Sequence, residues 1–185
     1  MKEKTNKSGK KIYDLCTVAI AASFITVCAW ISIPFPISIT MQTFAICAVC
    51  GILGLKRGFL SVLVYFCLGL VGLPVFSGFR GGISALADPS GGYLLGFLFL
   101  ALTVGVASEL FSKKTIVLAC SMGVGMLLCY SCGSLWYYFL YAREATFMVV
   151  ISTSVLPFVI PDILKIILAS IIVKYANKST WAKRL

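Results

Sequence analysis

Long apolar runs, bounded by basic residues or proline, limit more than any other feature what this chain can fold into. About 20 consecutive apolar residues cross a bilayer as one helix, and 60% of the 185 residues are hydrophobic while 12% are charged. A water-soluble domain carries about 25% charged residues, so this chain has too few charges to cover its surface. The sequence therefore predicts an all-α integral membrane protein with one small domain.

The apolar runs predict six transmembrane helices between two basic tails, residues 1–11 and 177–185. Within the membrane domain, residues 12–176, a glycine-rich outer loop covers residues 77–91. Residues 145–159 are apolar but too few to cross, so we expect them to fold back or to lie at the interface. The expected spans are residues 13–33, 40–55, 58–76, 92–111, 115–141 and 161–175.

The positions of the basic residues predict the orientation of these spans. Most of the 16 lysines and arginines lie in the two tails and at the turns Lys56–Arg57 and Lys113–Lys114, whereas Arg80 and Arg143 fall on the other side. Cytoplasmic segments of membrane proteins carry the excess of Lys and Arg. We therefore expect a multi-pass plasma-membrane protein with both termini in the cytoplasm. The same rule explains the net charge of +10 without a nucleic-acid partner.

The residues that are missing argue against an enzyme. The chain contains no histidine, which removes Ser–His–Asp and Cys–His nucleophile systems and the usual imidazole zinc sites. It contains neither glycine-rich nucleotide-binding motif. The Cys47/Cys50 and Cys129/Cys132 pairs lie inside apolar runs without nearby polar groups, so we expect no metal site. An energised function would therefore depend on an ion gradient or on another protein.

Asp162 and Lys165 are the most informative residues, because ionisable groups at membrane depth are costly and normally face a protein interior or a wet cavity. They stand three residues apart on a helix that Pro161 is expected to begin, so they share one face near its N-terminus. A pair that only neutralises itself is the simpler alternative. The functional alternative is a ligand site near the outer end of the bundle. There, Asp162 would accept hydrogen bonds from ligand N–H groups, and Lys165 would donate to a ligand carbonyl or carboxylate.

Glycine, polar and aromatic residues on the outer side are further candidates for ligand contacts. Glycine allows close backbone approach, an arginine suits an anionic group, and aromatic rings can stack on a flat ligand. Ordinary connectors, helix caps and interfacial anchors use the same residue types, so these residues alone leave the role open. The candidates are Thr40, Gln42, Thr43, Ser77, Gly78, Phe79, Arg80, Gly91, Gly92, Tyr93 and Trp136.

The first span carries small residues at helical spacing: Ala19, Ala22, Ser23 and Thr26. Small residues let another helix approach closely. The spacing fits a helix of this chain and a helix of a partner equally well.

Four blocks of the sequence carry a family resemblance. They are IPFP with TMQTFA between Ile33 and Ala45, GLVGLPVF from Gly69 to Phe76, PSGGYLLGF from Pro89 to Phe97, and PDILK from Pro161 to Lys165. Together and in this order they resemble the biotin-specific substrate-binding subunit, BioY, of energy-coupling factor (ECF) transporters. The likeness covers nearly the whole chain from the first span to the last.

The resemblance implies an S-component fold of six helices in a bacterial plasma membrane, which captures biotin from outside with high affinity and without a cofactor of its own. It also implies a transmembrane coupling subunit, met through the small residues of the first helix, and two ATPases that supply the nucleotide site. Family members often carry an amide in the loop at residues 77–80, and its absence here makes the match there looser. The positions that match the family's ligand site are Thr40, Gln42, Thr43, Gly91, Gly92, Tyr93, Asp162 and Lys165.

Two other functions remain open from the sequence. A related subunit could capture another vitamin, or a secondary carrier could couple a solute to protons through Asp162. Secondary carriers commonly contain inverted repeats with broken helices, and no convincing repeat relates the two halves of this sequence.

Overall fold

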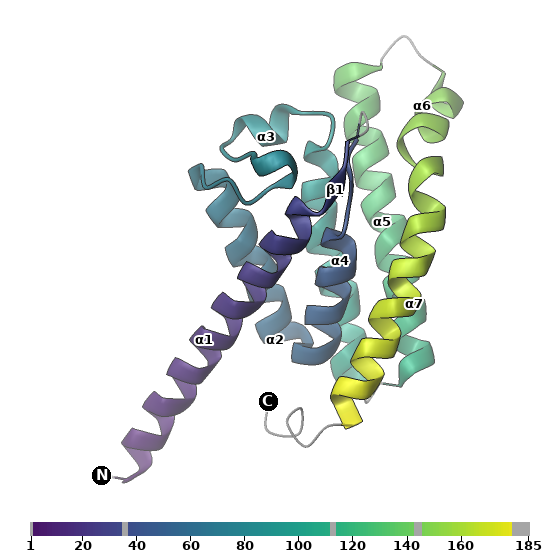
Figure 1. The fold of residues 1–185 in the computed structure, drawn as a ribbon. Helices are drawn as coiled ribbons and strands as arrows, with labels where there is room; N and C mark the ends of the chain where they lie inside the picture. The colour runs from purple at the N-terminus through teal and green to yellow at the C-terminus, as the bar shows by residue number, and fades with distance from the viewer. Residues whose placement is uncertain (1, 35–36, 112–113, 143–145, 179–185) are drawn as a thin grey trace.

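Five long apolar helices make up most of the computed structural model (Figure 1). By length and composition each could cross a membrane, in α1 from Gly9 onwards. They are α1 (Lys2–Trp30), α2 (Gln42–Val71), α4 (Gly91–Leu110), α5 (Thr115–Tyr141) and α7 (Leu156–Lys178). The shorter elements are β1 (Ser32–Ile33), β2 (Ile39–Thr40), the 3-10 helix η1 (Ser77–Phe79), α3 (Ser84–Ala87) and α6 (Phe147–Ser154). The structure describes residues 2–34, 37–111, 114–142 and 146–178, without the side chains of residues 2–8 and Phe147.

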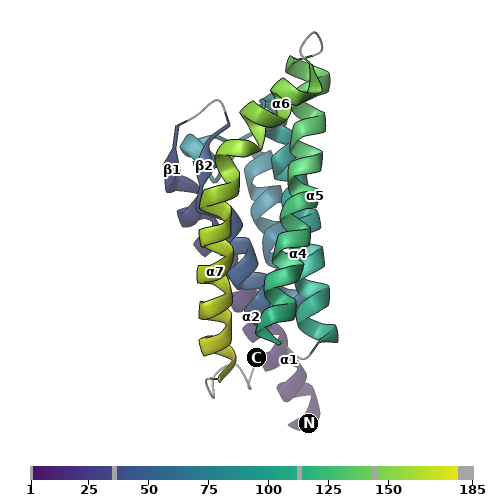
Figure 2. The ribbon, with the colours of Figure 1, turned by 90° about the vertical axis from the view of Figure 1, so that its right-hand side faces the viewer.

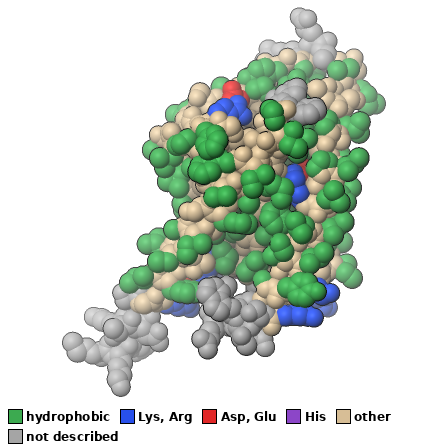
Figure 3. Space-filling view, in the orientation of Figure 1, with side chains coloured by type: hydrophobic (Ala, Val, Ile, Leu, Met, Phe, Trp, Pro, Cys, Tyr) green, Lys and Arg blue, Asp and Glu red, His purple; other side chains and the backbone are tan. Residues whose placement is uncertain are grey.

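The helices form a bundle with α2 and α4 at its centre. Helix α4 packs against α2 and α5, while α1 and α7 pack against α2. Figure 2 shows α7 with α5 on one side and the β1–β2 hairpin on the other. Outward side chains such as Leu127 on α5 and Ile163 on α7 are more than half exposed, and hydrophobic side chains are spread over much of the face in Figure 3. An apolar surface of this extent is typical of a membrane-facing protein.

Helix α2 is broken at Gly54, where the chain reverses. Gly54 has φ 78° and ψ −171°, a conformation that is essentially restricted to glycine. An unbroken helix would separate Gln42 from Tyr65 by about 35 Å, yet their side chains are hydrogen-bonded. The reversal also brings Gly58 so close to Cys50 that a Cβ on Gly58 would lie 2.8 Å from the Cys50 Cα. The expected spans 40–55 and 58–76 therefore correspond to the two arms of α2, with the break at Gly54 instead of at Lys56–Arg57 and with the second arm ending at Val71, before the expected end at residue 76.

Several expected span boundaries differ from the helix ends in the structure. Helix α1 begins at Lys2 within the expected basic tail and ends at Trp30, before the short antiparallel pair of β1 and β2. The prediction of an all-α fold missed this hairpin. Residues 145–159 contain α6, but the last of them already belong to α7, which begins at Leu156 and carries Pro161 inside it. Residues 161–175 thus lie within a longer helix. Lys113, Arg143 and residues 179–185 lie outside the described residues.

The two ends of the bundle differ in charge. Lys10 and Lys11 near the start of α1, Lys56 and Arg57 after the Gly54 turn, and Lys174 and Lys178 near the end of α7 lie at one end, where Figure 3 shows Lys and Arg side chains gathered. An ion pair of 2.6 Å between Arg57 and Asp14 ties α1 to the α2 turn there. The opposite end carries the β1–β2 hairpin and the loop from Gly72 to Ser90 (Figure 1).

Candidate functional site

A pocket opens at the end of the bundle opposite the basic residues. The empty space among its lining atoms is about 650 Å³ with the mouth included, of which about 50 Å³ admits the centre of a water molecule. A single water needs about 10–15 Å³ of such space, so the inner part of the pocket is narrow and has room for a few water molecules. Its polar and charged lining residues are Ser38, Thr40, Gln42, Thr43, Ser77, Arg80, Ser90, Tyr93, Tyr130, Asp162 and Lys165.

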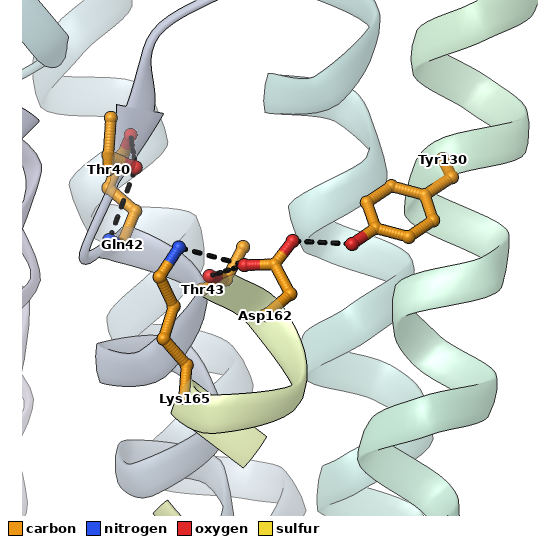
Figure 4. Close-up of polar contacts among 6 residues, drawn as sticks. All are labelled: Thr40, Gln42, Thr43, Tyr130, Asp162 and Lys165. Atoms are coloured by element: carbon orange, nitrogen blue, oxygen red, sulfur yellow. Dashed lines mark hydrogen bonds and ion pairs between the residues drawn. The ribbon is translucent and has the colours of Figure 1, made fainter. Parts of the chain in front are cut away.

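The carboxylate of Asp162 lines this pocket and is the centre of a cluster of polar contacts (Figure 4). Its Oδ1 accepts hydrogen bonds from Lys165 Nζ at 2.8 Å and from Thr43 Oγ1 at 3.1 Å. Its Oδ2 accepts a bond of 2.5 Å from Tyr130 Oη. The three donors come from α7, α2 and α5, so Asp162 joins three helices at one point.

Burial makes this cluster unusual in an apolar bundle. Asp162 is 4% exposed and Lys165 is 8% exposed. A buried charge is stable only when it is paired and hydrogen-bonded, and the carboxylate meets this condition. Lys165 carries three N–H groups, and among the described residues only Asp162 accepts one of them. The ammonium therefore has donors left over beside a pocket.

A chain of hydrogen bonds fixes the wall of the pocket next to Asp162. Thr40 Oγ1 donates to Gln42 Oε1 at 3.0 Å, and Gln42 Nε2 donates to Tyr65 Oη. Tyr65 in turn donates to the carbonyl of Val75 at 3.2 Å. Because Tyr65 lies on the second arm of α2, the chain connects β2, both arms of α2 and the start of the loop.

The loop after α2 covers the pocket on its outer side. Arg80 donates from Nε to the Ser77 carbonyl at 3.0 Å and forms an ion pair with Asp88 through Nη1. These contacts close the loop on itself and place Arg80 at the pocket. Ser77 Oγ also belongs to the lining, is buried, and has no hydrogen-bond partner among the described residues. A buried hydroxyl without a partner is costly, so it is a natural contact for a ligand.

The structure brings eight of the predicted ligand residues to this one pocket. They are Thr40, Gln42, Thr43, Ser77, Arg80, Tyr93, Asp162 and Lys165. Among them, Tyr93 donates its hydroxyl to the Ser154 carbonyl and stacks on Phe158 at a ring distance of 6.1 Å.

Five predicted residues do not line the pocket. Phe79 is 64% exposed and packs on Trp30 at a ring distance of 5.0 Å, next to Gly78. Gly91 lies against the backbone of Leu86, and Gly92 lies against Trp136 and the Cys132 carbonyl. A side chain at Gly92 would overlap Trp136, so both residues belong to the contact between α4 and α5.

The small residues of α1 divide between two faces. Ala22 and Thr26 are buried inside this chain, whereas Ala19 and Ser23 are exposed. The hydroxyls of Ser23 and Thr26 both donate to backbone carbonyls of their own helix. Only Ala19 and Ser23 are therefore free to meet another protein.

Sequence reasoning missed Tyr130 and the aromatic walls of the pocket. Tyr130 stands in the middle of α5, where a hydroxyl at membrane depth needs a partner, and this signal could have found it. Phe76, Phe97 and Phe158 also line the pocket, but such residues are common in any apolar span. Within the described ranges, no group of three or more Cys, Asp or Glu side chains is placed to hold a metal ion.

Comparisons with known proteins agree with this picture. The model of the BioY family matches residues 1–181. The chain is 37% identical to the biotin transporter BioY of Thermotoga maritima over 163 residues, which cover 86% of this chain and 92% of that protein. It is 34% identical to the probable biotin transporter BioY of Pyrococcus horikoshii over 171 residues, which cover 92% and 99%.

A solved structure is also similar. It is the crystal structure of the S-component for biotin from an ECF-type ABC transporter, with a TM-score of 0.83 and 27% sequence identity. The match covers 92% of this chain and 94% of that chain.

Proposed function

Because the chain belongs to the BioY family, we infer that it takes up biotin as the substrate-specific subunit of an ECF-type transporter and that it is not an enzyme. The observation that assigns this function to a site is the buried Asp162–Lys165 pair, because both residues line the pocket and Lys165 keeps N–H groups that Asp162 does not accept. Biotin presents a ureido ring with two N–H groups and a carbonyl, an apolar thioether ring and chain, and a carboxylate. The pocket offers groups that complement each of these parts.

We propose specific partners for the polar atoms of biotin. A carboxylate accepts about four hydrogen bonds, and Asp162 receives three within the chain, so one ureido N–H can occupy the position left on Oδ2. Lys165 donates one of its remaining N–H groups to the ureido carbonyl. Arg80 and Ser77, which belong to the loop over the pocket, donate hydrogen bonds to the carboxylate of biotin. The aromatic walls and Leu94 enclose the apolar part of the ligand.

We also propose that the protein makes six passes, with the two arms of α2 counted separately and both termini in the cytoplasm of a bacterial plasma membrane. The basic end of the bundle supports this orientation, because it would face the cytoplasm and the pocket would face outside. A transmembrane coupling subunit would dock on α1 through Ala19 and Ser23, and two ATPases would supply the energy that reorients the loaded subunit. The chain shows no nucleotide-binding motif of its own.

Equilibrium binding of biotin to the purified protein tests this function. We expect affinity tighter than micromolar, and competition by other vitamins only at large excess. Asp162→Asn should weaken binding by about 100-fold, since a hydrogen bond to a charged group contributes about 1.5–3 kcal/mol. Asp14→Asn is the matched control, because Asp14 lies at the opposite end in the ion pair with Arg57. Micromolar or weaker binding by the unmodified protein, or unchanged affinity in Asp162→Asn, would contradict the assignment.

A further inference from the structure

The bonds around Asp162 are distributed unevenly between its two oxygens. Lys165 and Thr43 both donate to Oδ1, whereas Tyr130 is the one donor to Oδ2 among the residues that the structure describes. Figure 4 shows Asp162 between Lys165 and Thr43 on one side and Tyr130 on the other. The remaining acceptor position of the carboxylate therefore lies on the oxygen that Tyr130 holds.

The hydroxyl of Tyr130 is itself held in place by helix packing. Its neighbour Cys129 is 1% exposed and donates from Sγ to the Tyr93 carbonyl at 3.7 Å. Gly96 on α4 approaches the Cys129 backbone so closely that an added Cβ would lie 2.8 Å from the Cys129 Cα. The backbone at Tyr130 thus has little freedom relative to α4, and its rigid ring delivers the hydroxyl to one point.

Without Tyr130, the carboxylate would be fixed at Oδ1 only. Only the bonds from Lys165 and Thr43 would then limit rotation about the Asp162 Cβ–Cγ bond. The acceptor position of Oδ2 that is left for a ligand would no longer point in a fixed direction. We propose that Tyr130 is a positioning residue for ligand recognition, which acts through Asp162 by aiming the remaining acceptor of Oδ2 into the pocket. This proposal rests on the function proposed above, since the ligand N–H that uses this acceptor is that of biotin.

A double-mutant cycle tests whether Tyr130 acts through Asp162. Biotin affinity is measured for the unmodified protein, Tyr130→Phe, Asp162→Asn and the double variant. We expect Tyr130→Phe to weaken binding about tenfold when Asp162 is present, as the loss of one bond to a charged group predicts. In the Asp162→Asn background the same change should alter affinity less than about twofold, because coupled residues are not additive.

Tyr137→Phe is the matched control, because Tyr137 lies on the same helix, stacks on Tyr141 and does not line the pocket. It should leave biotin affinity unchanged. The infrared carboxylate band of Asp162, identified by its loss in Asp162→Asn, should shift in ligand-free Tyr130→Phe and stay in place in Tyr137→Phe. If Tyr130→Phe fails to fold, a fluorotyrosine incorporated at position 130 keeps the ring and strengthens the donor, and it should shift the same band and change the affinity.

The outcomes distinguish a failure of this proposal from a failure of the proposed function. No biotin binding by the unmodified protein overturns both. Biotin binding with an equal loss from Tyr130→Phe in both backgrounds, no loss at all, an equal loss from Tyr137→Phe, or an unmoved Asp162 band overturns the role of Tyr130 alone.

Discussion

At the scale of single residues, the Asp162–Lys165 pair has a structural role and, in the function proposed above, a role in ligand recognition. The carboxylate connects α2, α5 and α7, so it stabilises the meeting of three helices. The ammonium keeps unused donors beside the pocket, which a purely structural pair would not need. The ion pair lowers the cost of burying both charges in an apolar bundle. Lys165 uses only one of its N–H groups in this pair, so a ligand acceptor can bind the others.

Stability measurements can separate the two roles. Lys165→Met leaves the Asp162 charge buried without its cation, and breaking a buried pair from one side costs about 3–5 kcal/mol. Thermal unfolding in detergent should therefore show a large loss. The double variant Asp162→Asn/Lys165→Met should recover most of it, because neither charge remains, while biotin binding stays lost. Lys174→Met, an exposed lysine on the same helix, is the control, and a Lys165→Met protein as stable as the unmodified one would argue against a charged Asp162.

At the scale of elements, glycines allow the contact between α4 and α5 that holds the Tyr130 side of the pocket. Gly92 accommodates Trp136, and Gly96 accommodates the backbone of Cys129. Small residues that recur every four positions let membrane helices approach closely. The Gly92–Gly96 spacing thus sets how near α5, with Tyr130, lies to the rest of the site.

Alanine substitutions test this contact. Gly96→Ala places a Cβ 2.8 Å from Cys129 Cα, so the helices must separate, and overpacking of this kind costs about 1–3 kcal/mol. Gly123→Ala on α5 is the control, because nothing lies within 4 Å of its Cβ position. That change should be neutral or stabilise by about 0.5–1 kcal/mol, since glycine is unfavourable inside a helix. Equal melting temperatures for the two variants would show that α4 and α5 are not closely packed at Gly96.

At the scale of the whole molecule, charge and pocket lie at opposite ends of the bundle. The basic end contains the start of α1, the Gly54 turn and the end of α7, and the pocket lies under the loop at the other end. In a membrane, this separation couples orientation to function, because a cytoplasmic basic end makes the pocket accessible from outside.

Reporter fusions check this orientation in the intact chain. Green fluorescent protein fused after the last residue should fluoresce, whereas alkaline phosphatase at the same place should be inactive, since the first folds in the cytoplasm and the second only outside it. A protease site inserted after Ile83, which is 75% exposed in the outer loop, should be cleaved in intact cells. Active phosphatase at the C-terminus, or cleavage only after lysis, would contradict the proposed topology.

Some contacts could be anticipated from the sequence and others could not. Asp162, Lys165, Thr40 and Gln42 stand out because polar groups are rare in apolar runs, and the structure gathers them at one pocket. The Tyr130 hydroxyl is a weaker signal of the same kind, and the aromatic walls give none, because their role depends on which helix face meets the pocket. Gly92 and Trp136 resemble ligand contacts in sequence but pack against each other.

The sequence by itself determined that this chain is a membrane protein, where its apolar helices lie, and that a few costly charges must be sheltered together. These conclusions follow from local composition, because the hydrophobic effect acts on each segment almost independently of the others. Only the tertiary structure decided that the chain reverses at Gly54 instead of at Lys56–Arg57, that α7 begins before Pro161, and that Tyr130 holds the second oxygen of Asp162. These features arise from contacts between segments far apart in the chain, and no local pattern specifies such contacts.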